Sequence, residues 1–135
     1  MLCSHCGICC QKTEMLLSMA DIRRLERAGY DRRKFVRHDK RGFAKVRNKS
    51  GYCVFYDAEK NRCKVYKYRP LGCRIYPVIL IEEEGIVADH ICPMKDTVSG
   101  KDLERNGEKV VKLLKRIDAE AKKRAFDMKT SISLK

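Results

Sequence analysis

Four cysteines stand within eight residues near the start of the chain, in the run Cys3-x-x-Cys6-x-x-Cys9-Cys10. A Cys-x-x-Cys turn presents two sulfurs to one ion at about 2.3 Å, and a third cysteine after the same gap extends the ligand set around a cluster. Adjacent cysteines such as Cys9 and Cys10 bridge each other only with strain, which counts against a plain disulfide framework. The run therefore predicts a metal centre, with disulfides or redox-active thiols as the alternative.

The other four cysteines are spread along the chain, at Cys53, Cys63, Cys73 and Cys92. Whether these cysteines bind metal or form disulfides depends on how oxidising the compartment of the protein is. No window approaches eighteen uninterrupted apolar residues, and the first residues show no secretory signal. We therefore expect a cytoplasmic protein with no membrane span, whose reduced cysteines hold metal or do redox chemistry. The 135 residues predict a single cysteine-cluster domain, 1–135, with the motif region at 3–93.

The net charge of +13 is concentrated in two segments. Residues 21–49 hold twelve basic and four acidic side chains, and residues 101–135 hold eleven and six. A basic surface binds nucleic acid, an anionic membrane or an acidic partner protein, and charge alone does not choose among them. A solvated, lysine-rich exterior without a specific partner is the simpler alternative.

The pattern after the cysteine run predicts short helices. Residues 13–17 read as an extended stretch, and Ser18 with Asp21 forms the start signal of a helix. Apolar residues then follow at helical spacing up to Gly29, where a C-terminal glycine is expected. Asp31 is the predicted cap of a second short helix that runs through 35–36.

Two hairpins and one long helix are predicted in the rest of the chain. Residues 43–46 and 52–56 flank a turn at 48–51, and residues 78–81 and 85–88 flank an acidic tip at 82–84. Residues 66–77 read as a loop with one helical turn. A helix from about 102 to 128 shows one apolar face, made of Val110, Leu113, Leu114, Ile117, Ala121, Ala125 and Met128. These elements predict a small α+β domain with short hairpins, a loop-rich cysteine centre and a long C-terminal helix packed on it.

The text around the later cysteines is distinctive. Cys53, Cys63 and Cys73 follow one another with nine residues between them, and the phrases Tyr68-Arg69-Pro70 and Arg74-Ile75-Tyr76-Pro77 stand beside Cys73. With the opening run, this text resembles the CxxCxxCC family of small cysteine-cluster proteins, described as a zinc- or iron-chelating domain, to which the flagellin lysine N-methylase is related. The resemblance extends from Cys3 to Cys92 and implies that all eight cysteines are candidate metal ligands.

The choice between iron and zinc rests on spacing. Cysteines at i, i+3 and i+6 with a remote Cys-Pro are similar to the set that wraps a four-iron cluster, and here that set is Cys3, Cys6, Cys9 and Cys92. Zinc sites usually combine two separated close pairs, whereas the last four cysteines have no short spacing between them. We favour a [4Fe-4S] cluster and keep zinc as the alternative.

Several other side chains are candidates for the same centre. Arg69 and Arg74 flank Cys73, where they offset the negative charge of a thiolate-bound cofactor, bind an anionic substrate or carboxylate, or anchor the loop. His5 and His90 lie close to cysteines in the sequence, as ligands, as hydrogen-bond donors to sulfur or as solvent-facing residues. His38 is expected at the surface.

The function that follows is a metal-centre protein in electron transfer, redox sensing or protein modification. The alternatives are a zinc-stabilised module whose basic surface binds an acidic protein or nucleic acid, and a carrier that hands metal to another protein. The chain has no glycine-rich nucleotide loop after a strand. Whether it is an enzyme is therefore left open, with protein lysine methylation as the activity that the resemblance implies.

Overall fold

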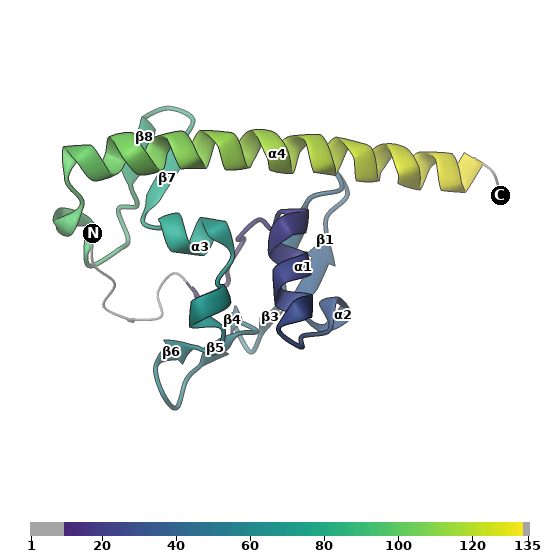
Figure 1. The fold of residues 1–135 in the computed structure, drawn as a ribbon, viewed down its shortest axis with the longest axis horizontal. Helices are drawn as coiled ribbons and strands as arrows, with labels where there is room; N and C mark the ends of the chain where they lie inside the picture. The colour runs from purple at the N-terminus through teal and green to yellow at the C-terminus, as the bar shows by residue number, and fades with distance from the viewer. Residues whose placement is uncertain (1–9, 134–135) are drawn as a thin grey trace.

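The longest element of the computed structural model is helix α4, Gly100–Ser133, which runs along one side of the molecule (Figure 1). The structure describes residues 10–133, with side chains through Asp127. Ser99 caps the helix, because its hydroxyl accepts from the Asp102 N–H at 3.1 Å while the Asp102 carboxylate accepts from the Ser99 N–H at 3.0 Å. The predicted C-terminal helix is confirmed and is longer at both ends.

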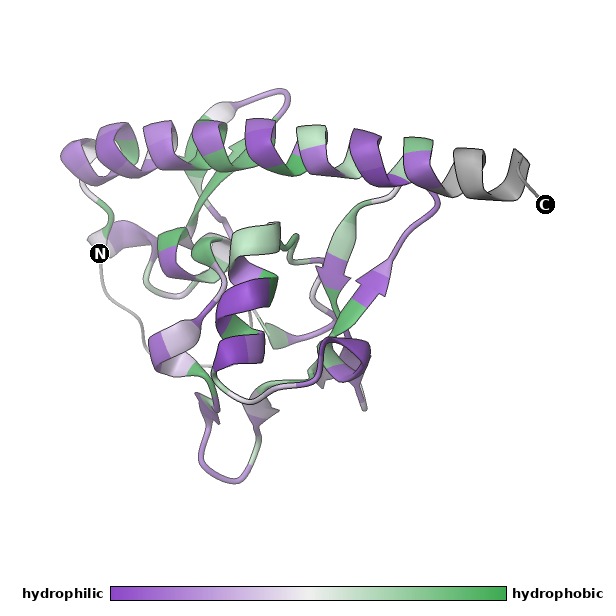
Figure 2. Ribbon diagram, turned by 45° about the vertical axis from the view of Figure 1, so that its right-hand side comes forward, coloured by the Kyte–Doolittle hydropathy of each residue, from purple (hydrophilic) through white to green (hydrophobic). Residues whose placement is uncertain are grey.

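The apolar face of α4 packs against three other elements: strand β7 (Val78–Ile81), strand β8 (Gly85–Ala88) and helix α3 (Leu71–Ile75). Figure 2 shows hydrophobic residues where α4 meets the β7–β8 hairpin and hydrophilic residues along much of the rest of the helix. The buried residues of this face are Val110, Leu113, Ile117 and Ala121. Leu114 and Ala125 are partly buried, and the Met128 side chain lies outside the described part. The helix is therefore packed on the chain itself, as predicted.

The first two helices follow their predicted caps. Helix α1, Met19–Arg27, begins with a capping box between Ser18 and Asp21. It is followed by Gly29 with φ of 104°, a left-handed conformation that favours glycine. Helix α2, Arg32–Phe35, begins at Asp31, whose carboxylate accepts from the Arg33 N–H at 3.0 Å.

Within residues 10–133 the strands form four separate antiparallel hairpins, and one predicted pairing is wrong. Residues 78–81 do pair with 85–88, as predicted. Strand β2 (Ala44–Val46), however, pairs with β1 (Val36–His38) and not with residues 52–56. The Asp39 carboxylate closes the β1–β2 turn by accepting from the N–H groups of Arg41 and Phe43 at 2.9 and 3.0 Å. Because this turn is short, β2 pairs with the strand directly before it and not with a strand later in the chain.

The strand predicted at 52–56 is divided between two short strands, β4 (Tyr52–Cys53) and β5 (Tyr56–Asp57). Strand β4 pairs with β3 (Asn48–Lys49), and β5 pairs with β6 (Arg62–Cys63). Ser50 and Gly51 both have positive φ, which suits a two-residue hairpin turn between β3 and β4. The predicted loop at 66–77 contains a short 3₁₀ turn, η2 (Tyr66–Tyr68), followed by α3. A further 3₁₀ turn, η3 (Lys95–Thr97), precedes α4.

Two hydrophobic clusters hold these elements together. The first joins α1, α2 and the β1–β2 hairpin to Phe55 and Val65, with Leu17, Leu25 and Phe35 almost fully buried. The second lies between α3, β7 and α4 and includes Ile75, Val78 and Ile117. Both helices and hairpins contribute to the core, which confirms the predicted α+β class. No helix in the described residues is long and apolar enough to cross a membrane.

Candidate metal centre

The segment that follows the opening cysteine run is paired to the β3–β4 hairpin. Gln11 forms an antiparallel bridge with Tyr52, and the Lys12 N–H donates to the Gly51 carbonyl oxygen at 2.7 Å. Gln11, the residue after Cys10, therefore lies beside Tyr52, the residue before Cys53, although 41 positions separate the two in the sequence.

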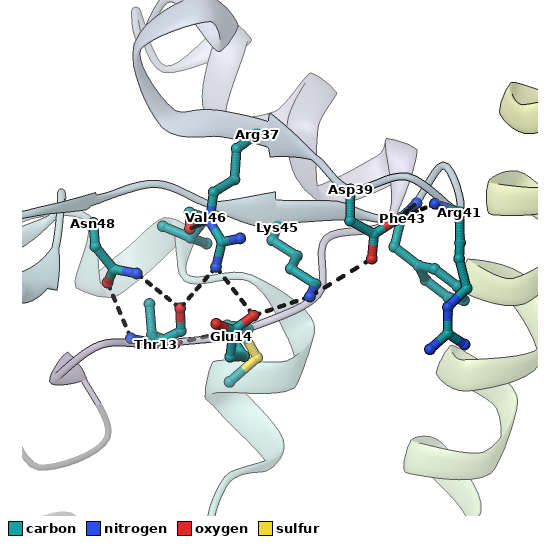
Figure 3. A network of polar contacts seen from close by, with 10 residues as sticks. Thr13, Glu14, Arg37, Asp39, Arg41, Phe43, Lys45, Val46 and Asn48 are labelled. Carbon is teal, nitrogen blue, oxygen red and sulfur yellow. Dashed lines mark hydrogen bonds and ion pairs between the residues drawn. The ribbon is translucent and has the colours of Figure 1, made fainter. Parts of the chain in front are cut away.

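A polar network fixes the next residues of the same segment (Figure 3). The Thr13 N–H donates to Asn48 Oδ1 at 3.0 Å, and Asn48 Nδ2 donates back to the Thr13 carbonyl oxygen at 2.9 Å. Glu14 accepts from Lys45 Nζ at 2.9 Å and from Arg37 at 3.1 Å. The hydrogen bond from Lys45, followed by that from Arg37, lowers the pKa of Glu14. The chain leaving the cysteine run is thus held against β1 and β2.

Cys63 belongs to the neighbouring hairpin. It pairs with Tyr56 in the β5–β6 register, and the Lys64 N–H donates to the Phe55 carbonyl oxygen at 2.7 Å. Cys53 and Cys63 are both partly buried against the first hydrophobic cluster. These two cysteines therefore lie at the ends of strands that are only two residues long, where the backbone itself offers few hydrogen bonds.

Cys73 lies in α3, and the buried carboxylate of Asp21 fixes the start of this helix. Asp21 Oδ1 accepts from the Leu71 N–H at 3.0 Å and from Arg24 Nη2 at 2.7 Å. The same Arg24 nitrogen donates to the Arg69 carbonyl oxygen at 2.9 Å. Helix α1 therefore holds the backbone on both sides of Pro70 and sets the position of the turn that bears Cys73.

The long-range role of Asp21 is not evident from the sequence. The local pattern identifies it as the acidic partner of the Ser18 cap, and this role is confirmed by the Ser18 N–H that donates to Asp21 Oδ2 at 3.1 Å. Its contact with Leu71 joins residues fifty positions apart. The side chain is only 1% exposed, and a buried carboxylate with several donors is the structural signal that reveals such an anchor.

Cys92 follows β8 in a turn that is tied to α3. The Asp89 N–H donates to the Pro77 carbonyl oxygen at 2.7 Å, and the Tyr76 hydroxyl donates to Asp89 Oδ2 at 2.6 Å. The Cys92 N–H then donates to the Asp89 carbonyl oxygen at 3.1 Å. Asp89 thus links the Arg74–Pro77 phrase to the Cys-Pro segment, two pieces of the motif that are distant in sequence.

A cavity of about 470 Å³ lies between residues 11–16, α3, β7 and α4. Most of its wall is apolar, with Met15, Leu16, Leu113 and Ile117 among the lining residues. Three other lining residues are sequence neighbours of cysteines, in the pairs Cys10–Gln11, Gly72–Cys73 and Ile91–Cys92. The sequence neighbours of three cysteines, from three distant segments, therefore line one cavity, although the three cysteines themselves are not among its lining residues.

The five described cysteines are all partly buried: Cys10, Cys53, Cys63, Cys73 and Cys92. Within residues 10–127 no three His, Cys, Asp or Glu side chains lie close enough together to hold a metal ion. Cys3, Cys6, Cys9 and His5 lie outside the described residues, so the predicted set of Cys3, Cys6, Cys9 and Cys92 stays a prediction. The structure places the later cysteines relative to residues 11–14, the segment that follows the opening cysteine run.

Arg69 and Arg74 contact their own loop. The Arg69 guanidinium carbon lies 3.8 Å from the centre of the Tyr66 ring, and Arg69 Nε donates to the Tyr66 carbonyl oxygen at 3.0 Å. Arg74 Nη2 donates to the Lys67 carbonyl oxygen at 2.8 Å. These contacts are those of the loop-anchoring alternative, and a part in cofactor binding stays a prediction for both arginines.

Two histidines lie at the surface. His90 Nε2 is 3.2 Å from a carboxylate oxygen of Glu84, across the β7–β8 hairpin tip. His38 lies at the end of β1, where the burial of part of its ring, followed by the charge of Arg124, lowers its pKa. The described contact of His90 is therefore with a carboxylate, and His38 has the surface position predicted for it.

Comparison with known proteins agrees with the cysteine pattern. An uncharacterized protein of Methanocaldococcus jannaschii is 32% identical over 78 residues, which are 56% of this chain and 43% of that relative. The chain thus spans less than half the length of the curated relative that it matches. No solved structure matches it. The family model CxxCxxCC, with the description "Putative zinc- or iron-chelating domain", matches residues 2–93, and the chain belongs to this family.

Proposed function

We propose that this zinc- or iron-binding domain holds a [4Fe-4S] cluster on cysteine thiolates and uses it in a redox or protein-modification role. The observation that supports a shared centre is the placement of Cys10, Cys73 and Cys92 next to lining residues of one cavity. The first ligand set is Cys3, Cys6, Cys9 and Cys92, and the other four cysteines either tune this centre or hold a second one. When bound, such a cluster supplies one-electron transfer.

The surroundings suit a thiolate-bound centre. All five described cysteines are partly buried, so each has limited contact with solvent but can still be reached from the surface. Thiolates are soft donors that select iron–sulfur clusters and zinc over hard cations such as magnesium. Thiolates on a cluster add negative charge, and the guanidinium groups of Arg69 and Arg74 stand in the loop beside Cys73 to offset it. We place the protein in the reducing cytoplasm, because thiols stay reduced there and available as ligands.

Purification without oxygen, followed by absorbance spectroscopy and a count of iron, sulfide and zinc per chain, tests the proposal. A brown protein with a broad band near about 400 nm and equal iron and sulfide supports the cluster. Cys92→Ser should then reduce the iron and sulfide content, while Lys95→Gln, at an exposed position three residues further on and outside the cavity lining, should not. A colourless protein without iron would contradict the proposal.

A zinc-stabilised module is the second candidate, and one observation favours it. Cys53 and Cys63 lie at the ends of two-residue strands packed on the first cluster, where a tetrahedral zinc would hold hairpins that have few backbone hydrogen bonds. This candidate predicts one or two zinc ions per chain and no visible absorbance. Removal of zinc would then loosen the β3–β6 region before it affects α4.

The modification to assay first is methyl transfer from S-adenosylmethionine to a protein lysine, since the family resemblance includes the flagellin lysine N-methylase. Radiolabelled methyl transfer by the anaerobically purified protein would support an enzymatic role. If the cluster is present but no transfer occurs, electron transfer or redox sensing is the role to test next. Those two results separate the presence of the cofactor from its use.

A further inference from the structure

One edge of the exposed face of α4 carries mostly basic side chains over most of its length, with Glu108 among them. Six exposed side chains form it, and we call it the basic stripe: Lys101, Arg105, Lys109, Lys112, Arg116 and Lys123. Successive members are separated by four, four, three, four and seven residues. Since residues three, four or seven apart lie on the same side of a helix, the six side chains share one line along α4.

The stripe is distinct from the rest of the exposed helix surface. Lys115 and Lys122 are also exposed, but they lie on the other edge together with Glu104 and Asp118, so positive and negative charges alternate there. No ion pair connects a member of the stripe to another described residue. Glu108 and the half-buried Glu120 interrupt the stripe, which still carries a net positive charge, whereas the opposite edge, with Lys115 and Lys122 against Glu104 and Asp118, is close to neutral.

Helix α1 reaches the same side of α4. The Met19 N–H donates to both carboxylate oxygens of Glu120 at 3.0 and 3.2 Å, and Glu120 lies between Arg116 and Lys123 in the helix. The exposed Arg23 is one turn further along α1. The fold thus brings the start of the first basic segment of the sequence next to the stripe.

We propose that the basic stripe binds the phosphate backbone of double-stranded nucleic acid without reading its sequence. From Lys101 to Lys123 the stripe extends over about 33 Å at 1.5 Å per residue. One strand of a duplex carries a phosphate about every 3.4 Å, so this length faces about ten base pairs. Six cations, spaced three, four or seven residues apart over the length of one turn of duplex, face the regular negative charge of the phosphate backbone.

The surroundings of the stripe argue against two other partners. An amphipathic helix that lies on a membrane buries its apolar face among the lipids, but the apolar face of α4 is already covered by α3, β7 and β8. Single-stranded nucleic acid is usually held by aromatic side chains on which the bases stack. The exposed aromatic residue described on α4 is Phe126, three residues beyond the last member of the stripe.

The test is binding of the full, metal-loaded chain to fluorescent DNA and RNA duplexes of about 25 base pairs, measured by anisotropy at several salt concentrations. If all six cations contact phosphates, the slope of log K against log salt is about −5, and the affinity falls about a thousandfold between 50 and 200 mM salt. The double variant Lys109→Gln with Lys123→Gln should make the slope less steep by about two. The matched control, Lys115→Gln with Lys122→Gln, removes the same charge from the same helix and should leave the slope nearly unchanged.

Each outcome decides the proposal. Equal effects of the two double variants would overturn it, because net charge alone would then explain the binding. It would also be overturned by the absence of duplex binding at low salt, or by tighter binding to single strands or to anionic vesicles than to duplexes. Circular dichroism of both variants, with helix content unchanged, shows that a loss of binding is not a loss of α4.

Discussion

Asp21→Asn tests whether one buried carboxylate holds the turn that bears Cys73. The carboxylate accepts from three partners: Ser18 N–H, Leu71 N–H and Arg24. Asparagine has nearly the same shape, but it has one oxygen and one NH₂ group in place of two oxygens. If the oxygen stays with Leu71 and Arg24, the NH₂ group faces the Ser18 N–H, and two donors meet in a buried place.

The expected loss of stability follows from these contacts. Leaving the buried Ser18 N–H without its acceptor costs about 1 kcal/mol, and each of the two hydrogen bonds that changes from charged to neutral loses about 1 kcal/mol more. The Arg24 side chain is 29% exposed, so its ion pair is partly screened by water and adds less than a buried pair would. The sum is about 3 kcal/mol, which corresponds to a fall of about 10 °C in Tm for a chain of this size.

Urea unfolding and thiol trapping measure the two consequences of this change. In the metal-free protein, Asp21→Asn should speed alkylation of Cys73, because Leu71 is two residues before it, while alkylation of Cys53 should change little. Asp31→Asn is the control, since Asp31 also caps a helix and pairs with an arginine, but it does so at the surface. If both variants showed the same small loss of stability and the same Cys73 reactivity, the anchoring role of Asp21 would be refuted.

Three further changes test other parts of the fold. Gly42→Ala should destabilise the protein by about 2 kcal/mol or more in a urea titration, because Gly42 has a φ of 88° and an added Cβ would lie 2.5 Å from an α4 carbonyl oxygen. Gly51→Ala is the control and should cost less, because Gly51 has a similar φ of 83° but open space around the added Cβ. Ile117→Ala should cost about 3 kcal/mol by loss of core packing, whereas Val111→Ala, at an exposed position, should have little effect on the urea midpoint. Because the pKa of Glu14 is lowered in the folded protein, Glu14 stabilises the fold above its ordinary pKa of 4.5, and this stabilisation is lost as the pH falls below that value. The Tm of Glu14→Gln should therefore decline less than that of the wild type between about pH 5 and pH 3. An equal decline would exclude this carboxylate as a source of acid sensitivity.

The elements that the sequence predicted well are those whose signals are local. The cap at Ser18, the glycine after α1 and the acidic tip between β7 and β8 each act within a few residues. The long helix was visible because its apolar face repeats over several turns. In these cases the physical cause of the element lies within the segment itself.

The parts that the sequence left undetermined depend on distant partners. Two-residue strands such as β4 and β5 are too short to show an alternating pattern, so their pairing is set by neighbouring turns and not by periodicity. The same is true of the candidate site. Nothing local indicates that Gln11 pairs with Tyr52, that Asp21 binds Leu71, or that Asp89 binds Tyr76.

The division of the interior into two clusters has a consequence for how the protein unfolds. Cys53 and Cys63 pack on the first cluster, whereas Cys73 and Cys92 belong to segments that border the second. A metal bound by cysteines of both groups would act as a crosslink between two small cores and would make them melt together. Loss of the metal would then appear as lost cooperativity, with a broad or two-step transition in place of a single sharp one.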